Sequence, residues 1–171
     1  MKGTCVAPIV LALLSFGAAS WAAADDVAVI VHKSNAIGGL TIGQLRKIVL
    51  GQQTKWPGER RIAVLMTTPG QLERDTTLRV VCGMSETSFR LHFTHASFRE
   101  GVANFHGPKW SPPDVGESPT TFGSGVQVQQ SVAGTPGAIG FIKASQLDGS
   151  VKVITIDGSH PGDPAYKLKL K

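Results

Sequence analysis

The chain has 171 residues, of which 42% are hydrophobic, and a formal net charge of +5. This length can bury a hydrophobic core and is typical of one domain. The basic residues are scattered and do not interleave with aromatic residues, which argues against a nucleic-acid-binding surface. The mild positive excess is compatible with an anionic ligand or an anionic membrane surface.

The first residues have the order of a secretory signal peptide. Lys2 supplies a positive charge, Val6–Ala19 is predominantly apolar, and Ala22–Ala24 provides small residues before Asp25. The apolar stretch is shorter than the roughly 20 residues that span a bilayer. We therefore expect residues 1–24 to be a signal peptide, cleaved after Ala24 or alternatively after Ala22. The expected location is the periplasm or the outside of the cell, without a membrane anchor.

The two cysteines predict no disulfide in the processed chain. Cys5 lies within the signal peptide, too early for a lipoprotein cysteine, and only Cys82 remains. Because Cys82 follows two valines, we expect a buried small apolar side chain, with a redox role as the less favoured alternative.

The first half of the chain predicts alternating strands and helices. Val27–Val31 is a β-branched run typical of a buried strand, and a loop follows over 32–40. Thr41 is placed to cap a helix over 42–49 that ends at Gly51. A second strand is expected over 61–66, after the turn at Trp56.

The second half continues the alternation. Helices are expected over 71–81, with Leu72, Leu78 and Val81 buried, over 85–93, and from Gly125 to Gly134. Residues 101–119 are rich in Gly and Pro and predict a loop. Strands are expected over 138–142 and 151–156. From Gly158 we expect a loose basic tail over 158–171.

This alternation predicts an α/β fold with a parallel or mixed sheet. The expected strands lack a polar face, which indicates that helices cover the sheet on both faces.

Three segments together resemble the phosphate-binding proteins of ABC transporters, which have the type 2 periplasmic binding protein fold. They are the helix Leu40-Thr41-Ile42-Gly43-Gln44-Leu45-Arg46-Lys47-Ile48-Val49-Leu50-Gly51, then Trp56, then Pro136-Gly137-Ala138-Ile139-Gly140-Phe141. The likeness covers about residues 27–157. It implies a three-layer single lobe over 25–157, with a mixed central sheet and helices on both faces. It also implies that Val27–Val31 and Ala138–Ile142 lie together as hinge strands, and that the family's first lobe is missing.

The resemblance implies an anion site after the second expected strand. The family has an arginine there and then the motif Gly-Ser-Gly-Thr-Arg. Gly70 and Arg74 match this pattern, whereas Thr67 replaces the first arginine and Gln71-Leu72-Glu73 replaces Ser-Gly-Thr. Losing that guanidinium removes a bidentate anion clamp, and Glu73 adds a charge of the wrong sign.

A helix start provides a second argument for an oxyanion site. The turn Thr68-Pro69-Gly70-Gln71 precedes one expected helix, and Ser124-Gly125 precedes another, so free amide hydrogens are expected at both places. The alternative is that the threonines and the serine cap their helices. The candidate ligand-binding residues are Thr67, Thr68, Gly70, Gln71, Arg74 and Ser124.

Other chemistries have little support in the sequence. His92 and His95 share a helical spacing, but no acidic or cysteine partner follows at metal-binding distance, so we expect no metal and no cofactor. No Gly-x-Ser-x-Gly nucleophile motif occurs, and we expect no enzyme. We expect a non-enzymatic protein that binds a phosphate-like anion for an ABC transporter. The alternative is an envelope accessory protein that kept the lobe and lost the anion site, and a third possibility is a hydrolase that uses a serine or a histidine.

Overall fold

The structure is a computed structural model that describes residues 26–102 and 118–170, with side chains described over 26–94 and 118–170. The predicted signal peptide and most of the predicted loop over 101–119 lie outside these ranges. The main sheet contains, in spatial order, β4 (Thr120–Phe122), β3 (Ala63–Thr67), β5 (Ala138–Lys143), β1 (Val27–Val31) and β6 (Lys152–Val153). A small second sheet pairs β2 (Gly39–Leu40) with β7 (Thr155–Ile156).

The main sheet is mixed. β3 runs parallel to both β4 and β5, whereas β1 runs antiparallel to β5 and β6. The register places Val29 opposite Phe141. This confirms the expected pairing of Val27–Val31 with Ala138–Ile142, although these segments are far apart in the sequence.

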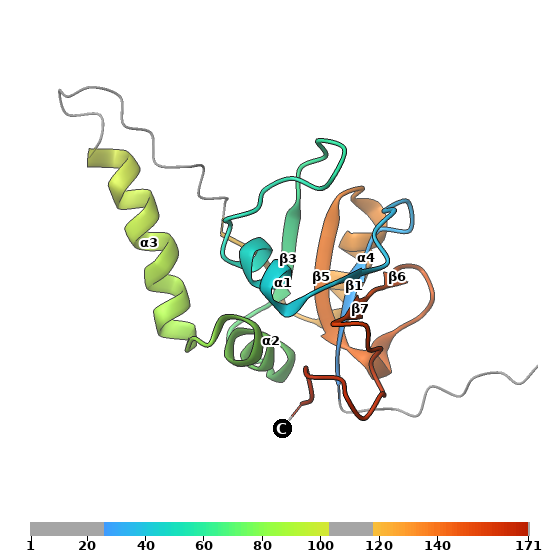
Figure 1. Cartoon of the computed structure of the whole chain (residues 1–171). Helices are drawn as coiled ribbons and strands as arrows, with labels where there is room; N and C mark the ends of the chain where they lie inside the picture. The colour runs from blue at the N-terminus through green and yellow to red at the C-terminus, as the bar shows by residue number, and fades with distance from the viewer. Residues whose placement is uncertain (1–25, 103–117, 171) are drawn as a thin grey trace, which may run out of the picture.

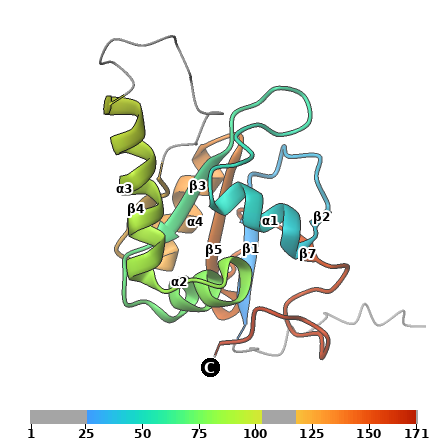
Figure 2. The ribbon, with the colours of Figure 1, turned by 60° about the vertical axis from the view of Figure 1, so that its left-hand side comes forward.

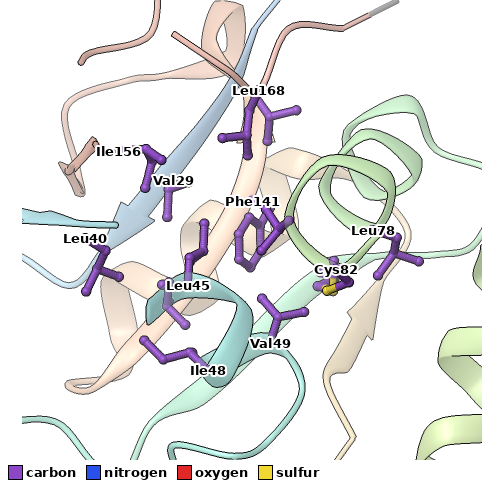
Figure 3. Close-up of a cluster of buried hydrophobic side chains, with 14 of the residues drawn as sticks. Val29, Leu40, Leu45, Ile48, Val49, Leu78, Cys82, Phe141, Ile156 and Leu168 are labelled. Atoms are coloured by element: carbon purple, nitrogen blue, oxygen red, sulfur yellow. The ribbon is translucent and has the colours of Figure 1, made fainter. Parts of the chain in front are cut away.

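Helices cover both faces of the sheet (Figures 1 and 2). The helical elements are α1 (Ile42–Val49), α2 (Leu72–Thr77), the π-helix η1 (Leu78–Cys82), α3 (Glu86–Val102), α4 (Gly125–Gly134) and the 3-10 turn η2 (Ala144–Gln146). On one face, Leu45 of α1 and Leu78 of η1 pack with Val29 and Phe141 (Figure 3). On the other face, Val128 and other apolar residues of α4 pack against Ile30. The predicted three-layer α/β architecture is confirmed.

Two of the segments that carry the resemblance are in direct contact. Trp56 donates its indole N–H to the carbonyl oxygen of Gly137 at 2.8 Å, so the tryptophan fixes the turn before β5. Gly140 lies under α4, where an added Cβ would come within 2.8 Å of Val128 and of Val132. Glycine at 140 therefore allows α4 to approach the sheet closely.

The segment after β3 differs from the single helix predicted over 71–81. It changes from α-helix to π-helix at Leu78 and ends at Gly83, whose φ is +66°. The prediction that Leu72 is buried was wrong, because half of this residue is exposed (50%). Leu72 opens α2, and the helix instead buries Glu73 and Arg74, which a search for apolar spacing does not detect.

Other boundaries also differ. The strand predicted over 151–156 is split at Ile154 between the two sheets, and α3 continues to Val102, beyond the predicted end. The strand β4 was not predicted, since its three residues follow a region read as loop. It is short, and its strand neighbour in the sheet is β3.

The prediction of a loose tail from Gly158 was wrong for the segment around Tyr166 and Leu168. Tyr166 and Leu168 are buried, and the Tyr166 hydroxyl donates to the carbonyl oxygen of Val27 at 2.7 Å. The amide of Val27 donates in turn to the carbonyl oxygen of Leu168 at 2.8 Å. The basic residues alternate with these apolar ones, so the charges are on the outer side of a segment that closes one end of the core.

Candidate functional site

Two parallel strands end side by side at the candidate site. Thr67, the last residue of β3, is in register with Phe122, the last residue of β4. The amide of Thr68 donates to the carbonyl oxygen of Phe122 at 2.9 Å, which holds the two following loops together. α2 begins after the first loop and α4 after the second. Ligands of open α/β sheets bind at such carboxyl ends.

Thr67 is fully buried, and its hydroxyl has no hydrogen-bond partner. Leu65 belongs to the apolar cluster under α4, and side chains alternate along a strand, so Thr67 lies on the α4 face. An unpaired buried hydroxyl costs free energy, about 1–3 kcal/mol in mutational data. The Thr67 hydroxyl can therefore form a hydrogen bond with a ligand at the end of β3.

The loop after β3 positions two other candidate residues. Gly70 is exposed with a φ of +89°, a conformation that favours glycine. Gln71 is the N-cap residue of α2, and its side chain makes no capping hydrogen bond. The N-cap position of α2 is thus occupied by Gln71 and not by one of the threonines proposed as caps, and the first-turn amides receive no side-chain cap from Gln71.

Ser124 has a structural role at the start of α4. Its hydroxyl accepts a hydrogen bond from the amide of Gln127 at 3.4 Å, as an N-cap does. Capping thus accounts for Ser124, while its position beside the first loop leaves it at the rim of the candidate site.

Arg74 is on α2, and only 4% of it is exposed. Its Nε and Nη2 donate to the two carboxylate oxygens of Glu86 at 2.7 and 3.0 Å, and its Nη1 donates to the carbonyl oxygen of Thr67 at 2.9 Å. The structure therefore places Arg74 against the backbone of Thr67, with its charge already paired by Glu86. The sequence analysis did not identify Glu86 as this partner, because the two residues belong to different helices and no motif links them.

Glu73, which was noted as a charge of the wrong sign, is 2% exposed, and its Oε2 has no partner. The charged side chains near the strand ends are thus the buried, paired Arg74, its partly exposed partner Glu86 and the buried Glu73. No described arginine of β3 or of its loop replaces the guanidinium that the resemblance leads one to expect.

Cys82 and His92, considered above for redox and metal chemistry, have contacts that give them structural roles. Burial raises the pKa of the Cys82 thiol to about 11, which opposes thiolate chemistry and fits a small core residue. His92 has its Nε2 3.1 Å from the carbonyl oxygen of Leu50. Within 26–102 and 118–170, no three His, Cys, Asp or Glu side chains gather as metal ligands would, and no helix has the length and hydropathy to cross a bilayer.

Comparison with known proteins links this geometry to binding proteins. No protein-family model and no curated sequence matches the chain. Among solved structures, a protein described as a phosphate ABC transporter substrate-binding protein from Clostridium perfringens, with bound phosphate, is 26% identical. Its TM-score is 0.58, over 80% of this chain and 47% of that chain.

Two further solved structures share the fold at lower identity. An ABC-type phosphate transport receptor from Vibrio cholerae is 23% identical, with a TM-score of 0.62 over 84% of this chain and 53% of that chain. PstS from Borrelia burgdorferi is 14% identical, with a TM-score of 0.56 over 80% and 49%. The chain has the mixed α/β fold of periplasmic binding proteins and spans about half the length of these structures.

Proposed function

We propose that this chain is an exported, non-enzymatic binding lobe that holds a small oxyanion such as phosphate where β3 and β4 end. The observation that carries the proposal is the buried, unpaired hydroxyl of Thr67 at this edge. α2 follows the loop after Thr67, and the side chain of its N-cap residue Gln71 makes no capping hydrogen bond. The phosphate-related names of the structural neighbours support the same ligand class.

The donor set implies weak binding. Arg74 is paired with Glu86, so the ligand is held by neutral hydrogen bonds rather than by a free cation. At about 1 kcal/mol for each of a few such bonds, the dissociation constant is on the order of 1 mM.

Isothermal titration of the protein lacking residues 1–24 with phosphate, sulfate and acetate tests the proposal. We expect heat with phosphate, and a Thr67→Val variant that binds about five-fold more weakly, the loss of about one hydrogen bond. Thr121→Val, an exposed threonine of β4, is the matched control and should bind as the parent does. No heat with any anion, or equal affinity in Thr67→Val, contradicts the proposal.

The second candidate is an envelope accessory protein that kept the lobe and lost the anion site. It is favoured by the carboxylate already bound to Arg74 and by the unpaired Glu73. The two functions separate cleanly: an accessory protein gives no heat with any anion and co-purifies with a protein partner from the cell envelope.

Export and partnership complete the proposal. We infer a periplasmic or secreted protein that works with an ABC transporter or another envelope protein. N-terminal sequencing of the protein from the producing cells should begin at Asp25, or at Ala23 if cleavage follows Ala22. If a second copy supplies the other half of the cleft, the binding stoichiometry will depend on protein concentration.

A further inference from the structure

We propose that the guanidinium of Arg74 is an oxyanion site that the protein fills with its own Glu86 carboxylate. Small carboxylates or phosphate take this place when the Glu86 side chain is removed. The inference goes beyond the proposed function, because this site is formed by the guanidinium of Arg74 and does not use the Thr67 hydroxyl.

The geometry of Arg74 is that of a prepared anion receptor. Two of its nitrogens meet both oxygens of Glu86, the bidentate arrangement that arginine also forms with free carboxylates and phosphates. The third nitrogen is held by the carbonyl oxygen of Thr67, and the guanidinium lies 5.7 Å from the ring centre of Phe89. Since neither contact involves Glu86, both can hold the guanidinium in place without it.

The position of the carboxylate is open to solvent although the arginine is not. The side chain of Glu86 is 23% exposed, against 5% for Arg74. Glu86 lines an open hollow of about 430 Å³, together with Asp75, Leu78, Arg79, Gly83, Met84 and Ser85. A small anion can therefore reach the place of the carboxylate from this hollow, although Asp75 on its wall is also acidic.

The charge balance requires an anion at this position. Removing one partner of a buried ion pair leaves an unpaired buried charge, which destabilises a fold strongly. A variant without the Glu86 carboxylate therefore gains stability from any anion that fits against Arg74, and the gain should be larger than general ionic screening produces.

The test is chemical rescue of a Glu86→Ala variant. Its melting temperature should fall, and acetate or phosphate should raise it again by several degrees more than chloride at equal ionic strength. In titration calorimetry the variant should bind phosphate at least ten-fold more tightly than the parent. Glu59→Ala, which removes an exposed carboxylate paired with Lys55, should show no anion-specific response.

A double variant, Arg74→Met with Glu86→Ala, decides whether Arg74 is the receptor. It should lose the specific response to acetate and phosphate. The proposal is overturned if the single variant responds to these anions as to chloride, or if the double variant still responds. If the alanine variant does not fold by itself, its refolding is compared in acetate or phosphate and in chloride at equal ionic strength, and the same two outcomes overturn the proposal.

The two proposals fail independently. Phosphate binding by the parent that depends on Thr67, without rescue of the Glu86 variants, supports the proposed function and refutes this inference. Rescue through Arg74 without phosphate binding by the parent does the reverse.

Discussion

Buried polar side chains are concentrated in one segment, from the end of β3 through α2. Thr67, Glu73, Arg74, Thr76 and Thr77 are each at most 4% exposed, whereas β1 and β5 bury almost only apolar residues. Only part of this polar interior is satisfied, since Thr77 and Arg74 have partners while Thr67 and the Oε2 of Glu73 do not. A segment that keeps unpaired polar groups in the interior gives up stability there, which is common where a fold carries a binding site.

At the scale of single residues, Thr67→Val and Thr77→Val should have opposite effects on stability. Valine at 67 removes a hydroxyl that has no partner, so the free energy of unfolding should stay equal or rise by about 1 kcal/mol. Valine at 77 removes a hydroxyl that donates to the carbonyl oxygen of Glu73 at 2.7 Å. This substitution should lower the free energy of unfolding by about 1 kcal/mol. Urea denaturation in anion-free buffer measures both, and a loss in Thr67→Val would show that its hydroxyl has a partner.

At the scale of elements, the helices and strands that carry a local sequence signal were predicted, and those that depend on contacts distant in the sequence were not. α1 was predicted with its bounds, because the N-cap Thr41 and the terminating Gly51 are visible in the sequence. The structure adds that Gln44 completes a capping box with Thr41. β4 was missed because three residues beside a Gly- and Pro-rich stretch carry no periodicity. The closing segment was misread because Tyr166 and Leu168 alternate with lysines, and only their contact with β1 distinguishes them from a frayed end.

The closing segment should therefore contribute to stability. Leu168→Ala should lower the free energy of unfolding by about 2–5 kcal/mol, as for other large-to-small core changes. Lys167→Ala, whose side chain is exposed and paired with Asp157, should change it by less than about 1 kcal/mol. Urea denaturation of the two variants compares them directly, and equal, small effects would restore the interpretation of this segment as a loose tail.

At the scale of the whole molecule, the layer order was predictable and the site was only partly so. Continuous apolar strands indicated a sheet covered on both faces, which the two clusters confirm. Thr67, Thr68, Gly70 and Gln71 share the end of β3 and the loop after it simply because they are close in sequence, and their role as a site stays a prediction. The pairing of Arg74 with Glu86 was not foreseen, since it joins two helices across the turn at Gly83 and no short-range pattern encodes it.

Hydrogen exchange should rank the strands by their place in the sheet. The amides of β1 and β5, at the middle of the main sheet and with nearly all their side chains buried, should exchange only through global unfolding. The amides of β4, at the edge, should exchange through local opening, orders of magnitude faster. Exchange measured by NMR or mass spectrometry checks this, and equal protection of β4 and β1 would contradict it.

The antiparallel pairing of β1 with β5 sets the timing of folding. During synthesis Val27–Val31 is made first, and its register partners Ile139–Lys143 follow only after the whole segment between them has been made. Because β1 pairs with a strand so distant in the sequence, the fold has a high contact order, and such folds form slowly. Until β5 has been made, β1 lacks its partner strand and the sheet cannot form, and an unfolded polypeptide is the state that can be threaded through a narrow translocation channel.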